Sequence, residues 1–98
     1  MTTDTPIEAM FRLDGQVAIV TGASSGLGRR FVEVLRRAGA DVVAAARRAD
    51  RLETLAAETG AHPVVTDVAE PADVERLVAE AVSRFGRIDV LVNNAGIG

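Results

Sequence analysis

Glycine is concentrated in one short stretch of the chain, residues 21–28, which reads TGASSGLG. Gly22 supplies the positive φ that a sharp turn needs, Gly26 lets a phosphate approach the backbone, and Gly28 lets a following helix pack close to a sheet. A helix that begins here also offers unpaired N–H groups and the positive end of its dipole to an anion. The stretch therefore predicts a site for the pyrophosphate of a dinucleotide.

Two hydroxyl side chains, Ser24 and Ser25, lie within the same turn and add hydrogen-bond donors for a phosphate. The glycine spacing is G-x-x-x-G-x-G, which differs from the commoner G-x-G-x-x-G fingerprint. Glycines at a tight strand–helix connection also occur for purely structural reasons. The place of this turn, after the first strand of an alternating series, favours the binding interpretation.

A pair of arginines stands where a dinucleotide site usually carries a ribose-binding acid, about 20 residues after the glycines. The second apolar run ends at Ala46, and Arg47 and Arg48 follow at once. The nearest acid, Asp50, is better placed to cap the next helix. Because a guanidinium binds a 2′-phosphate through paired hydrogen bonds and charge, the sequence predicts NADP, with NAD as the alternative. The other interpretation is that one or both arginines only solvate a loop.

The apolar residues fall into four short runs separated by three helical patterns. The runs are continuously apolar, as in strands that are covered on both faces. This alternation predicts an α/β fold with a parallel sheet and right-handed crossovers. With a nucleotide-binding turn after the first strand, the expected strand order is 3-2-1-4, about half of a three-layer, doubly wound fold. The expected strands are residues 17–21, 42–46, 63–66 and 88–92.

Glycines and a proline mark the ends of the three predicted helices. Gly39 stands where a left-handed C-terminal cap belongs, Gly60 and Gly86 close the next two helices, and Pro71 is placed in a first turn. Each helix then presents one apolar face. The face of the first is expected to comprise Leu27, Phe31, Val34, Leu35 and Ala38, and that of the third Val74, Leu77, Val78, Ala81, Val82 and Phe85.

The composition is that of a soluble globular protein of at most one domain, with 98 residues, 48% hydrophobic, 26% charged and a formal net charge of −3. The charges are scattered, and no apolar stretch approaches the roughly 18 residues that span a bilayer, so neither a nucleic-acid nor a membrane partner is expected. The absence of cysteine excludes disulfides and fits a reducing cytoplasm. Residues 1–10 read as a flexible leader, and Met10 offers a second candidate start of translation.

Three motifs, TGASSGLG at 21–28, DV at 67–68 and NNAG at 93–96, together resemble the classical short-chain dehydrogenase/reductase family. The flanking stretches FRLDGQVAIVTG and RFGRIDVLVNNAG are similar to that family as well. The resemblance covers residues 11–98 and depends on three motifs in the right order at the right intervals. It implies that this range is part of an NAD(P)-binding Rossmann domain.

The resemblance implies cofactor-binding roles position by position. Arg47 would meet the 2′-phosphate, Asp67 would accept from the adenine amino group, and the backbone of Val68 would read the ring edge. Asn93 and Asn94 would tie the fourth strand to its neighbours, a role that side-chain amides also have in structural settings. The residues along the phosphates and the adenosine ribose would be Gly22, Ser24, Ser25, Gly26, Leu27 and Gly28, with Asn94, Ala95 and Gly96 on the adenosine and ribose side.

The chemistry of that family is hydride transfer between a nicotinamide and the alcohol or carbonyl carbon of a small substrate, and the resemblance implies a homo-oligomeric parent. A tyrosine is its general acid/base, a lysine lowers the pKa of that tyrosine, and a serine polarises the carbonyl. The 98 residues contain no tyrosine and no lysine, so we expect cofactor binding without turnover. Such domains run to roughly 200–250 residues, which implies that over half of the domain lies outside this chain. Ser83 in a helix, His62 in a loop and Asp89 at a strand start are not expected to replace the catalyst.

Two other functions fit parts of this pattern. A half-Rossmann module that senses or scaffolds would need no catalyst. An epimerase or dehydratase relative would use the cofactor without net redox, but such turns usually read G-x-x-G-x-x-G, which residues 22–28 do not match. The apolar fourth strand would be central in a whole fold of this kind but lies at a sheet edge in these 98 residues, so we expect them by themselves to dissolve poorly or to self-associate.

Overall fold

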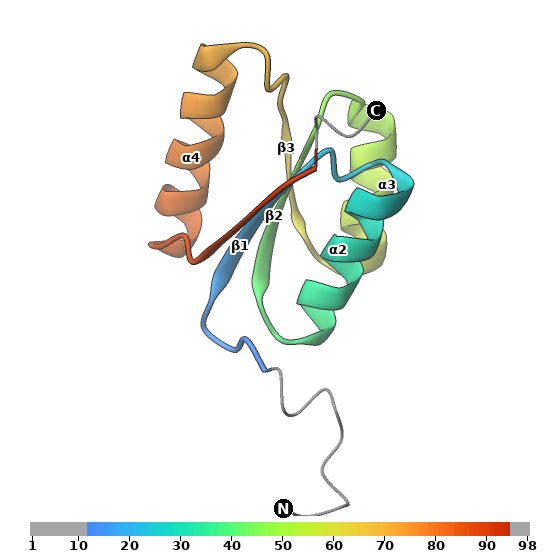
Figure 1. Ribbon diagram of the computed structural model, residues 1–98, viewed down its shortest axis with the longest axis vertical. Coiled ribbons are helices and arrows are strands. Elements are labelled where there is room, and N and C mark those ends of the chain that lie inside the picture. Colours follow the sequence, from blue (N-terminus) through green and yellow to red (C-terminus); the bar gives the residue numbers. More distant parts are fainter. Residues whose placement is uncertain (1–11, 95–98) are drawn as a thin grey trace, which may run out of the picture.

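The computed structural model describes residues 12–94, in which strands and helices alternate along the whole chain. The order confirms the predicted α/β pattern, and every predicted element is present (Figure 1). The elements are β1 (Val17–Thr21), α2 (Gly26–Arg37), β2 (Asp41–Ala46), α3 (Ala49–Thr59), β3 (His62–Val65), α4 (Pro71–Phe85) and β4 (Val90–Asn93).

The four strands form one parallel sheet in the order β3-β2-β1-β4, as predicted. In its central register Ile19 of β1 lies between Val43 of β2 and Leu91 of β4. Helices α2 and α3 cover one face of this sheet and α4 covers the other, which gives three layers (Figure 1). Because all strands are parallel, their carboxyl ends lie along a single edge.

The core is divided by the sheet into two clusters, because successive strand residues point to opposite faces. Every residue of β1 is buried, which explains why its sequence is continuously apolar apart from Thr21. The cluster under α2 and α3 includes Ala18, Val20, Val42, Ala44, Val32, Leu52 and Leu55. The cluster under α4 comprises Ile19, Val43, Ala45, Val64, Leu77 and Ala81.

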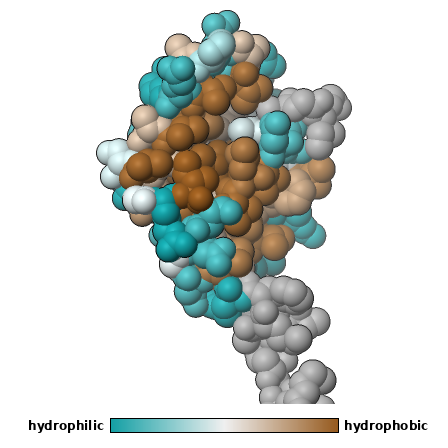
Figure 2. Space-filling model, turned by 60° about the vertical axis from the view of Figure 1, so that its left-hand side comes forward, coloured by the Kyte–Doolittle hydropathy of each residue, from teal (hydrophilic) through white to brown (hydrophobic). Residues whose placement is uncertain are grey.

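The apolar faces predicted for the helices are only partly correct. In α2 the buried side chain is that of Val32, whereas Leu27 and Val34 are half exposed. In α4 only Leu77 and Ala81 are buried. The remaining valines of α4 (Val74, Val78 and Val82) are exposed, because the sheet meets only one side of a broad apolar stripe. Figure 2 shows the apolar surface that results on this side of the molecule.

Three strands begin at a different residue from the one predicted, and β2 begins at Asp41 rather than Val42. β3 begins at His62 and ends at Val65, one residue earlier than expected at each end. β4 begins at Val90 rather than Ile88. The N–H of Val17 donates to the Oδ2 atom of Asp89 at 2.8 Å, so a side chain takes the place of a strand carbonyl just before β4 begins.

The helix ends follow the glycines, but one predicted cap is wrong. Gly60 and Gly86 have φ values of 80° and 83° and end α3 and α4. Asp50 does not cap α3: the cap position is Arg48, which makes no side-chain capping bond. The first helical hydrogen bond runs from Leu52 N to Arg48 O at 3.0 Å, so α3 starts sooner after β2 than expected. Asp50 consequently lies in the first turn of the helix.

Candidate functional site

A cleft of about 360 Å³ lies at the edge formed by the carboxyl ends of β1, β2 and β3. The glycine turn forms one wall of the cleft, the end of β2 forms its middle, and the turn after β3 forms the opposite wall. Six residues predicted from the sequence line it, namely Gly22, Ser24, Ser25, Arg47, Asp67 and Val68. Four others that the prediction did not assign to the site complete the lining: Ala46, Arg48, Thr66 and Ala69.

The glycine turn forms the sharp turn that was predicted, but the hydroxyl of Ser25 has a different role from the one expected. Gly22 has a φ of 61°, as its predicted place in a sharp turn requires. Ser25 is the N-cap of α2: its hydroxyl donates to Gly22 O at 2.8 Å and accepts from Gly28 N at 3.4 Å. Its proton is therefore used within the turn and is not free for a phosphate. Ser24, in contrast, has a hydroxyl with no hydrogen-bond partner among residues 12–94.

The other two glycines of the turn are surrounded very differently. A Cβ on Gly28 would overlap the carbonyl oxygen of Gly22 and lie 2.7 Å from Asn94 Nδ2, which confirms the close packing predicted there. A Cβ on Gly26 would have no neighbouring atom within 4 Å. Packing therefore requires Gly28, whereas Gly26 faces open space, as a ligand approaching the backbone would need. Leu27 between them is half exposed, and none of the three belongs to the cleft lining.

Two guanidinium groups stand at the end of β2. Arg47 is exposed and makes no hydrogen bond or ion pair within the described part of the chain. Arg48 lies 3.5 Å from the carboxylate of Asp50. The backbone N–H of Arg51 and the guanidinium of Arg48 hold the pKa of Asp50 below its usual range. Arg47 is thus the arginine in the cleft whose charge is not already shared with a carboxylate.

The turn after β3 is held by its own hydrogen bonds. The N–H of Asp67 donates to Asp73 Oδ2 at 2.9 Å, and Asp67 Oδ1 accepts from Ala69 N at 3.0 Å. Thr66 N donates to Ala46 O at 2.9 Å and so joins the ends of β3 and β2. These bonds orient Asp67 beside the cleft and leave its second carboxylate oxygen without a partner within residues 12–94. Thr66 and Ala46 were missed because nothing distinguishes them from other strand ends in the sequence.

The two asparagines at the end of β4, of which Asn93 is its last residue, connect that strand to the glycine turn. Thr21 Oγ1 donates to Asn93 Oδ1 at 2.9 Å and accepts from Asn94 N at 3.0 Å. Asn94 Nδ2 lies 3.2 Å from Gly22 O and 3.0 Å from Ser25 Oγ. Asn94 is 3% exposed, and its Oδ1 has no partner in the described residues. Ala95 and Gly96, also predicted to bind the cofactor, lie outside those residues.

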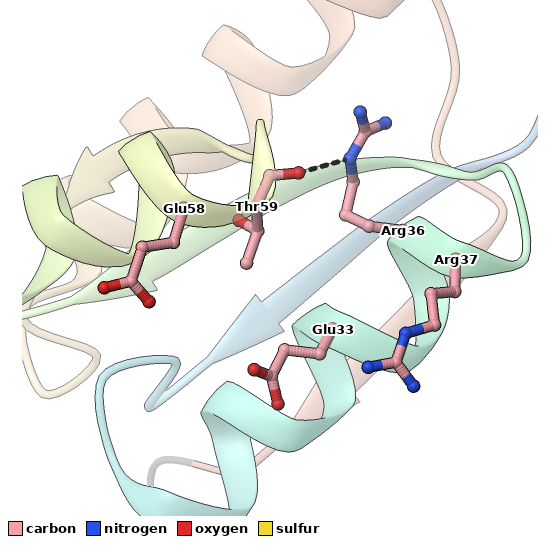
Figure 3. Close-up of a pocket in the computed structure, with 5 residues that line it drawn as sticks. All are labelled: Glu33, Arg36, Arg37, Glu58 and Thr59. Atoms are coloured by element: carbon pink, nitrogen blue, oxygen red, sulfur yellow. Dashed lines mark hydrogen bonds between the residues drawn. The ribbon is translucent and has the colours of Figure 1, made fainter.

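A further hollow, of about 390 Å³, lies between α2 and α3 (Figure 3). Its charged side chains come from both helices, and Arg36 reaches from α2 to donate to Thr59 O at 3.0 Å. Arg36 also donates to Ala40 O at 2.9 Å. The bond to Thr59 holds the ends of α2 and α3 together. The charged side chains of this hollow are therefore explained by the packing of the two helices. The lining residues are Glu33, Arg36, Arg37, Glu58 and Thr59.

The residues set aside as substitute catalysts do not gather in the cleft. His62 is the first residue of β3, and its Nε2 lies 3.0 Å from Glu80 Oε1 of α4. Ser83 lies within α4, and Asp89 precedes β4 instead of opening it. Between Arg12 and Asn94, no cluster of three or more His, Cys, Asp or Glu could hold a metal ion. Over the same range no helix has the length and apolar content needed to cross a membrane.

Comparisons with known proteins give a consistent result. The family model described as short chain dehydrogenase matches residues 16–98. An uncharacterised oxidoreductase of Staphylococcus haemolyticus is 45% identical over 91 residues, which cover 90% of this chain and 39% of that protein. A sorbitol dehydrogenase of Cereibacter sphaeroides is 43% identical over 88% of this chain and 34% of its own length.

Solved structures resemble the chain in the same way. The 3-ketoacyl-(acyl-carrier-protein) reductase of Brucella melitensis, solved in complex with NADH, superimposes with a TM-score of 0.78 at 38% identity. The matched part covers 81% of this chain and 33% of that one. The chain therefore spans between about a third and two fifths of the length of these three relatives.

Proposed function

The chain belongs to the short chain dehydrogenase family, and from that premise we propose that it is the NADP(H)-binding part of an oxidoreductase that acts on small alcohols or ketones. The observation that carries the choice of NADP is Arg47. It lines the cleft at the end of β2, where a ribose-binding carboxylate would favour NAD, and it has no ion-pair partner within residues 12–94. An uncommitted guanidinium there favours a 2′-phosphate.

The cleft and the adjoining glycine turn offer complementary groups for the pyrophosphate and the adenosine half of the dinucleotide. The pyrophosphate would lie over Gly26, where the backbone is open, at the N-terminus of α2. The adenine would lie beside Asp67 and Val68, with its amino group donating to the carboxylate. Asn94 supports the opposite wall, because its side-chain amide fixes the position of Gly22. From the family resemblance of the NNAG motif, we assign Ala95 and Gly96 to the adenosine and ribose side of the cofactor.

In this proposal the chain binds the cofactor but does not supply the groups that transfer a proton to the substrate. NADPH supplies a hydride when it is bound, and the residues of this chain bind it, orient it and exclude water from its adenosine half. No tyrosine or lysine is present in the 98 residues to protonate the substrate oxygen. The proton transfer and the substrate site therefore belong to a part of the parent protein that this sequence does not include, and substrate and oligomeric state are set there.

The absence of both catalytic residue types favours one alternative, a dinucleotide-binding module without catalysis. The reading frame after Gly98 distinguishes the two functions. A serine followed by Tyr-x-x-x-Lys in that frame supports the enzyme. A stop codon directly after Gly98, together with a stable and monomeric product, supports the module.

Cofactor titration tests the proposal directly. NADPH and NADH are each titrated against the 98-residue chain, and binding is followed by the fluorescence of the reduced nicotinamide. We expect saturable binding of both, with tighter binding of NADPH. If neither nucleotide binds, the assignment of the cleft to a dinucleotide is wrong. If both bind with equal affinity, only the assignment of NADP is wrong.

A further inference from the structure

The turn between β3 and α4 carries an acceptor and a donor, on neighbouring residues, that no other group uses. Asp67 and Val68 both line the cleft. One carboxylate oxygen of Asp67 accepts from Ala69 N at 3.0 Å, and the other has no partner within residues 12–94. The N–H of Val68 has no hydrogen-bond partner in that range either. A free acceptor next to a free donor is complementary to the amino group and the adjacent ring nitrogen of adenine.

Two side chains near the start of α4 hold the backbone that leads into this turn. Asp73 Oδ2 accepts from Asp67 N at 2.9 Å. Arg76 donates to the carbonyl oxygen of Val65, the last residue of β3, at 2.8 Å. The two side chains also pair with each other, because Arg76 Nη1 lies 3.4 Å from Asp73 Oδ1. Each oxygen of the Asp73 carboxylate therefore has its own partner, and neither Asp73 nor Arg76 lines the cleft.

The exposure of these two side chains separates their roles. The side chain of Asp73 is 27% exposed and that of Arg76 is 55% exposed. A hydrogen bond is stronger where water is partly excluded, so the bond from Asp67 N to Asp73 contributes more to holding the turn. Arg76 has the supporting role, because its guanidinium orients the Asp73 carboxylate from the solvent side.

Helix stabilisation alone does not account for Asp73. It lies in the first turn of α4, where an acidic side chain interacts favourably with the helix dipole. The N–H that it binds, however, belongs to Asp67, which lies outside the helix and six residues earlier in the chain. Glu70, at the N-cap of the same helix, makes no side-chain capping bond. Of these two acids, only Asp73 therefore connects the helix to the cleft wall.

We propose that Asp73, oriented by Arg76, is a positioning residue that makes the cleft selective for adenine over 6-oxopurines. This inference rests on the proposed function, because it takes adenine to lie beside Asp67 and Val68. With Asp67 N held, the free carboxylate oxygen and the free N–H keep a fixed relation to each other. Hypoxanthine presents an acceptor where adenine has its amino donor and an N–H where adenine has its ring acceptor. Both groups of the turn would then face a group of their own kind.

The test compares NADPH with its deamino analogue, in which hypoxanthine replaces adenine. Each is titrated by nicotinamide fluorescence against the 98-residue chain, Asp73→Ala, Asp73→Asn, Arg76→Gln and Asp67→Ala. Glu70→Ala is the matched control, because Glu70 is an exposed acid at the same helix end without a capping bond. The measured quantity is the ratio of the dissociation constants of the analogue and NADPH. A merely loosened fold weakens both ligands together and leaves this ratio unchanged.

The expected result is a loss of selectivity that follows the hydrogen bond to Asp67 N. We expect a ratio of about ten or more for the unsubstituted chain and for Glu70→Ala. Asp73→Ala lowers it to about three or less, and Arg76→Gln lowers it about twofold. Asp73→Asn keeps most of the selectivity, because its amide oxygen still accepts from Asp67 N. Asp67→Ala brings the ratio towards one.

Other outcomes overturn the inference and leave the proposed function distinguishable from it. An unchanged ratio in Asp73→Ala, with the fold verified by far-UV circular dichroism, shows that Asp73 does not position the turn. If Asp73→Ala does not fold, an unchanged ratio in Arg76→Gln has the same meaning. A fall in Glu70→Ala or Asp73→Asn equal to that in Asp73→Ala also overturns it, because charge rather than the hydrogen bond would then be responsible.

The proposed function has its own readouts in the same experiment. It stands in each of those cases if NADPH binds and Asp67→Ala lowers the ratio. If the unsubstituted chain binds both ligands equally well, adenine does not lie beside Asp67, and the inference fails together with that part of the proposed function. If neither ligand binds, the cleft is not a dinucleotide site.

Discussion

The side-chain amide of Asn94 donates to the carbonyl oxygen of Gly22 at 3.2 Å, although the two residues are 72 positions apart in the sequence. Through this bond the end of β4 supports the turn after β1, and the same amide lies 3.0 Å from Ser25 Oγ. Gly28 packs against both Gly22 and Asn94. The glycine turn is thus held from two sides by Asn94 and Gly28, which do not themselves line the cleft.

Substitution of the two turn glycines separates packing from binding. Gly28→Ala places a methyl group against the Gly22 carbonyl and the Asn94 amide, so we expect a loss of about 1–3 kcal/mol in the free energy of unfolding. Gly26→Ala meets no protein atom within 4 Å and is expected to change stability by less than about 1 kcal/mol. Gly26→Ala instead weakens NADPH binding. Urea denaturation and cofactor titration check both, and equal destabilisation by the two variants would refute this account of the turn.

Loss of the Asn94 amide tests the support of the turn. Asn94→Ala removes a buried donor and leaves Gly22 O and Ser25 Oγ without it, and we expect a loss of about 1–3 kcal/mol in unfolding free energy. Asn93→Ala is the matched control, because Asn93 is exposed and its Oδ1 accepts a hydrogen bond from Thr21 Oγ1. We expect it to cost less than about 1 kcal/mol. A larger loss in the Asn93 variant would contradict the assigned roles.

The pH dependence of stability should include a contribution from Asp89. The guanidinium of Arg87 and the backbone N–H of Val17 hold the pKa of Asp89 below its usual range. A carboxylate whose pKa is lower in the folded state stabilises that state above its unfolded pKa, near about 3.9, and loses this contribution as the pH falls through its folded value. Urea midpoints of the unsubstituted chain and Asp89→Asn should therefore differ at pH 7 and converge below about pH 4. A difference that persists unchanged at pH 2 would rule out this linkage.

Self-association of the chain is expected from its exposed apolar surface. Val74 and Val78 of α4 line one hollow with Leu91 of β4, which is 64% exposed, and β4 pairs only with β1 in the described sheet. Figure 2 shows the apolar surface on this side of the molecule. A free strand edge beside an apolar surface favours pairing with other chains. Sedimentation velocity should show concentration-dependent oligomers that Leu91→Lys reduces. A monodisperse monomer with cooperative unfolding would contradict this prediction.

The fold was predictable because its determinants are local. The buried strand VAIVT at residues 17–21, the glycines that end α3 and α4, and the turn between β1 and α2 each carry their own conformational signal. Together they predicted the strand order that the structure confirms. The boundaries of the elements were predicted less accurately. The cap assigned to Asp50 was wrong because the carbonyl of Arg48 already accepts the first helical hydrogen bond of α3.

The parts of the site that escaped prediction depend on contacts between distant segments. Nothing near Ser25 in the sequence indicates that its hydroxyl proton bonds to Gly22 rather than to a ligand. The exposure of Leu27 and Val34 follows from how α2 meets the sheet, which helical spacing alone does not fix.

Whether this chain binds NADP(H) through Arg47 is decided by the ratio of the dissociation constants for NADH and NADPH. The ratio is measured by nicotinamide fluorescence for the unsubstituted chain, for Arg47→Ala and for Arg30→Ala as the control. We expect a ratio of about ten or more for the unsubstituted chain and for Arg30→Ala, and a fall towards one in Arg47→Ala. A ratio near one in the unsubstituted chain, or an unchanged ratio in Arg47→Ala, would show that Arg47 does not bind the 2′-phosphate.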